Sequence, residues 1–288
     1  MKSLLFSPRA EFRLGAASVV APAVLALSCA SCGREPSGAD IVSQAVEAQG
    51  GAASFARVRF IERVSRVRIW AGGPGSTGSA EVAMGEIFDL PGRRIFVETA
   101  GRAGQAARFY DFTTEQGWKS APEGAVELTP ETSASDIASL QTEFVQCTGI
   151  EVFGLARLLS AGPASGRPGE EGSLAFAGRE ERNGREVLVL SHRPRAAEGG
   201  GGEGESRYLF DADSRLLVAK RTIVSREGLS PVESEYSYSD YRRLDGGILL
   251  PFRIELRDRG AVVSEIAVDR IALRDSIDPA ILRRPEPK

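Results

Sequence analysis

Runs in which apolar and polar residues alternate one by one fill most of this chain, and they constrain its fold more than any other feature. In the clearest run, at 250–257, Leu250, Phe252, Ile254 and Leu256 alternate with polar residues and one proline. Successive side chains of a β-strand point to opposite faces, so this run predicts a strand with one buried and one wet face. Strands of this kind are typical of antiparallel sheets, because parallel sheets are covered on both faces.

Similar runs, separated by glycine-rich turns, continue along the chain. A phase slip near Ser65 predicts a bulge in the first strand, and Asn183-Gly184 predicts a type I′ hairpin turn. We expect about ten antiparallel strands, at about 57–70, 81–89, 94–100, 106–113, 174–182, 187–192, 207–211, 216–225, 232–241, 248–258 and 261–273.

Helical periodicity occurs in two places only. Residues 40–49 predict an amphipathic helix that Asp40 caps and that Gly50-Gly51 ends. In the middle of the chain Ile137, Leu140 and Phe144 recur at helical spacing, and a second short helix is expected to end near residue 160.

So few helices cannot cover a sheet of this size, which must therefore curl to hide its apolar face. The fold class that we expect is mainly β (α+β): a single antiparallel, strongly curved half-open β-barrel with an N-terminal helix and an inserted helical lid. Cys147 continues the stripe of the lid and is expected to be a small buried residue.

The N-terminus has the order of a secretory signal. Lys2, Arg9 and Arg13 precede an uncharged apolar run that ends in small residues near Cys29. The run is shorter than the ~20 residues that a membrane-spanning helix needs. We therefore expect a signal peptide at 1–28, a tether at 29–39 and one folded domain at 40–288.

The residues before Cys29 resemble a bacterial lipobox, which predicts lipidation of Cys29 and a membrane anchor. The match is imperfect, because Ala26 stands where that motif prefers leucine. Use of Cys32 instead, or ordinary cleavage near Ala30 without lipidation, remain the alternatives.

Composition argues against several classes of function. The 36 basic residues nearly balance the 39 acidic ones, so no broad cationic surface is available for nucleic acid. His192 is the single histidine and there are three cysteines, too few for a histidine-rich zinc site. Acidic residues such as Asp111, Glu143 and Asp240 are scattered without a paired arrangement. We expect no catalytic residue, no metal site and no cofactor.

Three phrases near the C-terminus, at 208–217, 238–247 and 249–254, resemble the tail of outer-membrane lipoprotein-sorting proteins, the LolA/LolB-like superfamily. The resemblance spans about 40–286. It implies a half-open barrel around helices, with a hydrophobic cavity for acyl chains and no catalysis. In that family an arginine on an early strand helps to hold the lid; Arg63, Arg66 and Arg68 are all candidates here.

The resemblance therefore predicts a bacterial envelope lipoprotein on the periplasmic face, at the outer membrane rather than the inner one. Its partners would be a lipid or an acylated protein, bound in the barrel. The alternative is a periplasmic sensor or assembly module of the same fold that binds a protein partner. The residues expected to line the cavity are Phe60, Met84, Phe88, Phe176, Phe210, Phe252 and Ile254, with Ile137, Leu140 and Phe144 on the lid.

Overall fold

The computed structural model describes residues 35–70, 78–102, 104–121, 124–146, 151–152, 154–156, 172–194, 204–224 and 232–283. The helical elements are α1 (Gly38–Ala48), α2 (Ala52–Phe55), α3 (Pro130–Gln146), η2 (Asp245–Gly247) and η3 (Pro279–Leu282). The strands are β1 (Phe60–Trp70), β2 (Ser79–Asp89), β3 (Arg94–Gly101), β4 (Gly104–Asp111), β5 (Gln116–Ala121), β6 (Gly124–Leu128), β7 (Gly172–Arg182), β8 (Arg185–Pro194), β9 (Gly204–Asp211), β10 (Leu217–Val224), β11 (Val232–Arg243), β12 (Leu249–Asp258) and β13 (Ala261–Arg274).

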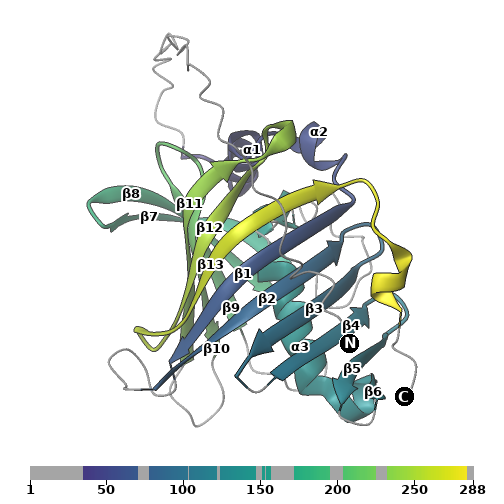
Figure 1. The fold of residues 1–288 in the computed structure, drawn as a ribbon. Coiled ribbons are helices and arrows are strands. Elements are labelled where there is room, and N and C mark those ends of the chain that lie inside the picture. The colour runs from purple at the N-terminus through teal and green to yellow at the C-terminus, as the bar shows by residue number, and fades with distance from the viewer. Residues whose placement is uncertain are drawn as a thin grey trace, which may run out of the picture.

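All thirteen strands belong to one antiparallel sheet, in the order β6-β5-β4-β3-β2-β1-β13-β12-β11-β10-β9-β8-β7. Two meanders, β1–β6 and β7–β13, are joined where β1 pairs with β13. The sheet curls strongly, and its edge strands β6 and β7 are not paired with each other within the described residues (Figure 1). The predicted fold class, a curved half-open antiparallel barrel with few helices, is confirmed, although the described residues form thirteen strands where about ten were expected.

The predicted hairpin turn is present between β7 and β8. Asn183 and Gly184 both have positive φ, at 52° and 74°, as a type I′ turn requires. β7 contains a bulge between Phe176 and Gly178, which bends the hairpin relative to the rest of the sheet.

A bulge is present at the predicted position near Ser65, but its extra residue belongs to the partner strand β13 and not to the first strand. β1 pairs with β2 without interruption from Phe60 to Trp70. β1 also pairs with β13, where Arg270 faces Val64 and Val268 faces Ser65. Asp269, between them, is therefore the extra residue of the bulge. The apparent phase slip has a different cause, which is that buried polar residues occupy the inner face of β1.

Helix α1 begins two residues earlier than predicted. Ser37 is the N-cap, and Asp40 is the third helical residue that completes a capping box with it. After the helix the chain passes close to η2. Gly50 has φ +115°, and a Cβ there would lie 2.7 Å from the Gly247 carbonyl oxygen, so only glycine fits.

The predicted insert is present as α3, with a kink at Ser133. In the region of the second short helix, residues 151–152 and 154–156 are helical. Helix α1 packs across one end of the curled sheet, and α3 crosses its first meander (Figure 1). None of the helices in the described ranges is long and apolar enough to cross a membrane.

Candidate functional site

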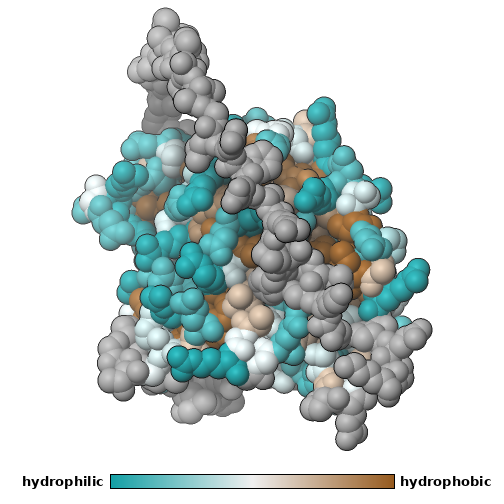
Figure 2. All heavy atoms as spheres, in the orientation of Figure 1, coloured by the Kyte–Doolittle hydropathy of each residue, from teal (hydrophilic) through white to brown (hydrophobic). Residues whose placement is uncertain are grey.

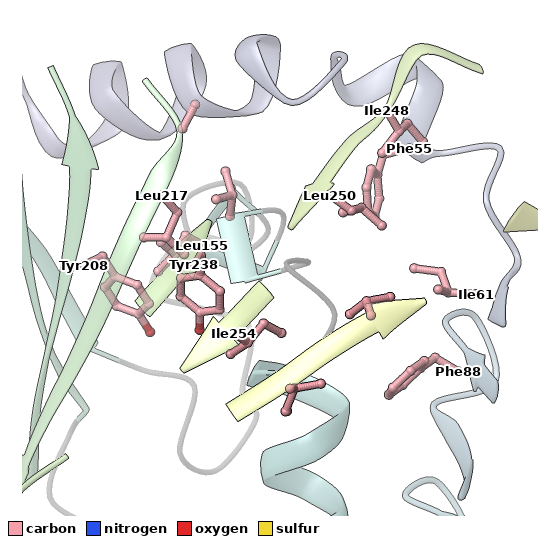
Figure 3. Packing of buried hydrophobic residues seen from close by; sticks show 14 of the residues in the cluster. Phe55, Ile61, Phe88, Leu155, Tyr208, Leu217, Tyr238, Ile248, Leu250 and Ile254 are labelled. Atoms are coloured by element: carbon pink, nitrogen blue, oxygen red, sulfur yellow. The ribbon is translucent and has the colours of Figure 1, made fainter. Parts of the chain in front are cut away.

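The inner side of the curled sheet carries one continuous apolar cluster, with members on strands from β6 at one end to β8 at the other and on α1 and α3. Met84, Phe88, Phe210, Phe252 and Ile254, which were expected to line the interior, belong to this cluster and are at most 7% exposed. Figure 3 shows how side chains from the sheet, Phe55 of α2 and Leu155 point toward one another. The described part of the inner wall is therefore apolar and tightly packed.

Two of the expected wall residues are placed differently from these five. Phe176 is partly buried against the same cluster. Phe60 lies on the opposite side of the sheet, in a separate cluster with Trp118 that η3 covers through Ile281. The expectation for Phe60 is wrong because β1 points Ile61, not Phe60, into the interior.

The apolar stripe predicted for the lid faces this interior. Leu140 is fully buried, and Ile137 and Phe144 pack against the cluster. The Phe144 ring lies 6.2 Å from that of Phe88 and 5.4 Å from that of Phe112, in tilted arrangements. Helix α3 therefore covers the inner face of the first meander mainly through three apolar side chains.

Two ion pairs connect α3 to the strands beneath it. Lys119 Nζ lies 2.8 Å from an Asp136 oxygen, and Arg108 lies 3.8 Å from Glu143. Lys119 is 40% exposed and Arg108 is 26% exposed. The Lys119–Asp136 pair is partly exposed and contributes little stability, whereas the Glu143 side chain is only 15% exposed and lies in a buried region.

Of the three arginines on the first strand, Arg63 is the one inside. Its Nε and Nη2 donate to the two Glu86 oxygens on β2 at 2.5 and 2.6 Å, and both side chains are at most 2% exposed. The guanidinium also lies 5.4 Å from the centre of the Phe88 ring. Arg66 and Arg68 point outward and form exposed ion pairs.

This buried ion pair extends to the lid through Glu143 of α3. Burial, and then the charge of Glu86, raise the pKa of Glu143 to about 7, against the opposing effects of Arg63 and Arg108. Three carboxylate and guanidinium groups thus share one buried region between α3 and the sheet.

A second polar cluster interrupts the apolar interior on the other meander. Lys220 Nζ donates to Glu151 Oε1 at 2.8 Å, and the Tyr238 hydroxyl donates to Glu151 Oε2 at 2.9 Å. Lys220 also lies 5.5 Å from the centre of the Tyr208 ring. The sequence analysis found neither buried ion pair, because partners 23 and 69 residues apart give no local signal.

The outer side of the sheet has two hollows lined by described residues. A groove of about 820 Å³ lies between the β7–β8 turn and the outer faces of β11 and β12, and charged residues of both signs line most of it. Arg182 donates to Glu235 there at 2.6 Å. A smaller hollow of about 280 Å³ adjoins η3 and includes Phe60. In Figure 2 hydrophilic residues and smaller apolar patches intermix on the face in view.

Several predicted features lie outside the described residues. They are the signal peptide, the lipidation site Cys29 with its alternative Cys32, and Cys147 of the insert. Within the described ranges, no group of three or more histidine, cysteine, aspartate or glutamate residues is arranged to hold a metal ion.

No family model matches the chain, and no curated protein matches it. Among solved structures, a LolA superfamily protein from Nitrosomonas europaea is 12% identical over 87% of this chain and 99% of its own, with a TM-score of 0.53. The chain has a LolA-like fold. A DUF1329 family protein from Desulfovibrio piger (11% identity, 85% and 95% coverage, TM-score 0.54) and an outer membrane lipoprotein-sorting protein domain from Vibrio parahaemolyticus (10%, 84% and 97%, TM-score 0.50) share it. At these identities the likeness concerns the fold alone, and it agrees with the resemblance of the C-terminal strands.

Proposed function

We propose that this protein binds long acyl chains, of a lipid or of an acylated protein, between the inner face of its sheet and helix α3. The observation that supports this most is the continuous apolar inner face, against which Ile137, Leu140 and Phe144 pack among the side chains of α3 that the structure describes. The LolA-like fold adds support, because one of the similar structures is described as a lipoprotein-sorting domain.

The burial energies of α3 and of an acyl chain are similar, so a ligand can replace α3 on the inner face of the sheet. Burial of Leu140, Ile137 and Phe144 stabilises the docked helix by about 1.5–3 kcal/mol for each side chain. An acyl chain gains ~0.8 kcal/mol for each buried methylene, so ten or more methylenes offset the loss of these contacts. The Lys119–Asp136 ion pair of α3 is partly exposed and adds little to the barrier.

In the cell the protein is exported and held at the periplasmic face of the envelope by lipidation at Cys29. The uncharged run before Cys29, with small residues directly ahead of it, is the basis for this part of the proposal. A lipid-anchored acyl-binding domain would work at the membrane that holds its cargo, with the outer membrane favoured.

The experiment is a titration of the folded protein with a fluorescent fatty-acyl probe. We expect saturable binding with micromolar or tighter affinity. Phe144→Glu places a carboxylate in the wall that the acyl chain would contact, so it should weaken binding at least tenfold. The matched control is Gln141→Glu, which adds the same charge on the exposed side of α3 and should leave the affinity unchanged.

A second candidate function is favoured by the tight packing of the interior. Met84, Phe88, Phe210, Phe252 and Ile254 on the inner wall are at most 7% exposed, whereas the large charged groove lies on the outer side, between β7–β8 and β11–β12. A sensor or assembly module could bind a protein partner there by charge complementarity. A well-folded preparation that shows no saturable probe binding would support this function instead of acyl binding.

A further inference from the structure

A gain in stability does not explain the second buried polar cluster, which Glu151, Lys220 and Tyr238 form. The Lys220 and Glu151 side chains are only 6% and 2% exposed. Val152 and Leu155, from the same short segment as Glu151, are buried beside them in the apolar cluster. Removing two charges from water costs several kcal/mol for each ion. A protein in which apolar residues of similar volume replace such a pair is often equally stable or more stable.

The charges in this cluster are nevertheless maintained. Burial lowers the pKa of Lys220, but the Glu151 carboxylate outweighs burial and the net pKa is raised, so the amine stays protonated. Burial, and then the nearby charge of Lys220, lower the pKa of His192, which is therefore neutral at pH 7. Burial raises the pKa of Tyr208 to about 12, so this phenol also stays neutral. Lys220 is thus the cation of this cluster, and Glu151 balances its charge.

The partners in this cluster come from two different parts of the fold. Tyr208, Lys220 and Tyr238 are on β9, β10 and β11, three adjacent strands of the sheet. Glu151 is one of the helical residues at 151–152 and 154–156, which lie on the inner face of these strands (Figure 3 shows Leu155 beside Tyr208 and Tyr238). The sheet therefore holds a fixed pair of donors, and the insert supplies the anion.

The pair of donors fits one chemical group. The ammonium contacts one carboxylate oxygen at 2.8 Å, and the phenol hydroxyl contacts the other at 2.9 Å. Two donors for two oxygens match a carboxylate, and charge-assisted bonds of this length are the strong ones. Apolar side chains of the same cluster, such as Leu217 and Ile254, surround the site.

Building on the proposed acyl binding, we infer that Lys220 and Tyr238 form a head-group site for a fatty-acid carboxylate, which Glu151 occupies in the absence of ligand. The acyl tail of such a ligand would lie in the apolar interior, while its carboxylate replaces that of Glu151. Glu151 is then an internal competitor that lowers the affinity for anionic amphiphiles. The cost of burying Lys220 is offset by whichever carboxylate is present.

The test is displacement of a neutral apolar probe, N-phenylnaphthylamine, from the full chain by dodecanoate, dodecanol and dodecyl phosphate. Wild type should bind dodecanoate at least fivefold more tightly than dodecanol. Glu151→Gln removes the competing charge and should tighten dodecanoate binding about tenfold while leaving dodecanol unchanged. The double variant Glu151→Gln/Lys220→Met, which leaves no buried charge unpaired, should fold and bind both ligands equally.

Each other outcome overturns the inference in a distinct way. If dodecanoate and dodecanol bind equally well to wild type and to Glu151→Gln, there is no head-group site, although acyl binding stands. If dodecyl phosphate binds more tightly than dodecanoate in a manner that depends on Lys220, the site recognises phosphate instead of a carboxylate. If the folded variants bind neither the probe nor any ligand, the proposed function fails together with the inference.

Discussion

Replacing Arg63 by methionine should destabilise the protein strongly. Both members of the Arg63–Glu86 pair are at most 2% exposed, and two hydrogen bonds of 2.5 and 2.6 Å join them. Breaking a buried pair by removing one partner costs about 3–5 kcal/mol, because the other charge stays buried without compensation. The nearby carboxylate of Glu143 adds repulsion to the charge left behind.

The assay is urea unfolding followed by tryptophan fluorescence, with Arg66→Met as the matched control. Arg66 is on the same strand and forms an ion pair with Asp269, but it is 58% exposed and points outward. Its replacement should leave the unfolding midpoint unchanged, because exposed ion pairs contribute little.

A double variant separates loss of the pair from a general packing defect. Arg63→Met with Glu86→Leu replaces both charges by apolar groups and should recover most of the stability that the single variant loses. Equal midpoint shifts for Arg63→Met and Arg66→Met would refute this reasoning. So would a double variant no more stable than Arg63→Met alone.

Three further predictions use the same structure. The Ile254 side chain is 1% exposed, so Ile254→Asn should lower the unfolding free energy by about 3 kcal/mol or more. Arg253→Asn, on the outer side of β12, should lower it little. Equal losses would mean that the two faces of the strand are reversed. The pKa of Glu143 is raised to about 7, so the folded state holds a proton that the unfolded state has lost. The unfolding free energy of wild type should therefore fall by on the order of 2–3 kcal/mol as pH rises from about 4.5 through 7. Thermal melts across this pH range should show no such fall for Glu143→Gln. Cys29→Ser should move the protein from the membrane fraction to the soluble fraction, and a wild type that is already soluble would disprove the anchor.

Alternation of residues predicts most of the sheet, and it fails where buried residues are polar. The inner face of β1 carries Ile61, Arg63, Ser65 and Val67, two of which are polar. The alternation of apolar residues therefore indicates the outer face as the buried one, and Phe60 is wrongly assigned to the interior. Only the pairing of Arg63 with Glu86 from another strand makes this arrangement stable. That partner cannot be identified from the local pattern of either strand.

The two strands that the sequence analysis missed, β5 and β6, have weak patterns of their own. β5 is six residues long and β6 five, and Trp118 is the one buried residue of β5. Pairing with β4 stabilises β5, and the Trp118 ring stacks on Phe109 at 6.4 Å. Tertiary contacts rather than intrinsic propensity thus decide these short strands.

The lid stripe at Ile137, Leu140 and Phe144 was predictable because helical periodicity is a local signal. The buried Glu151–Lys220 pair was not, since its two residues are 69 positions apart in the sequence and meet only in the folded protein. The sequence thus predicts which surfaces are apolar, whereas the polar groups within them depend on the folded arrangement.

Native mass spectrometry of the Cys29→Ser protein, purified without detergent from cells, tests the proposed acyl binding most directly. Without the covalent anchor, any acyl chain detected is bound non-covalently. We predict a bound acyl-containing molecule on a substantial fraction of the Cys29→Ser protein, and less of it when Phe144→Glu is added. A folded protein that carries no such molecule, and that acquires none after incubation with phospholipid vesicles, would contradict the account.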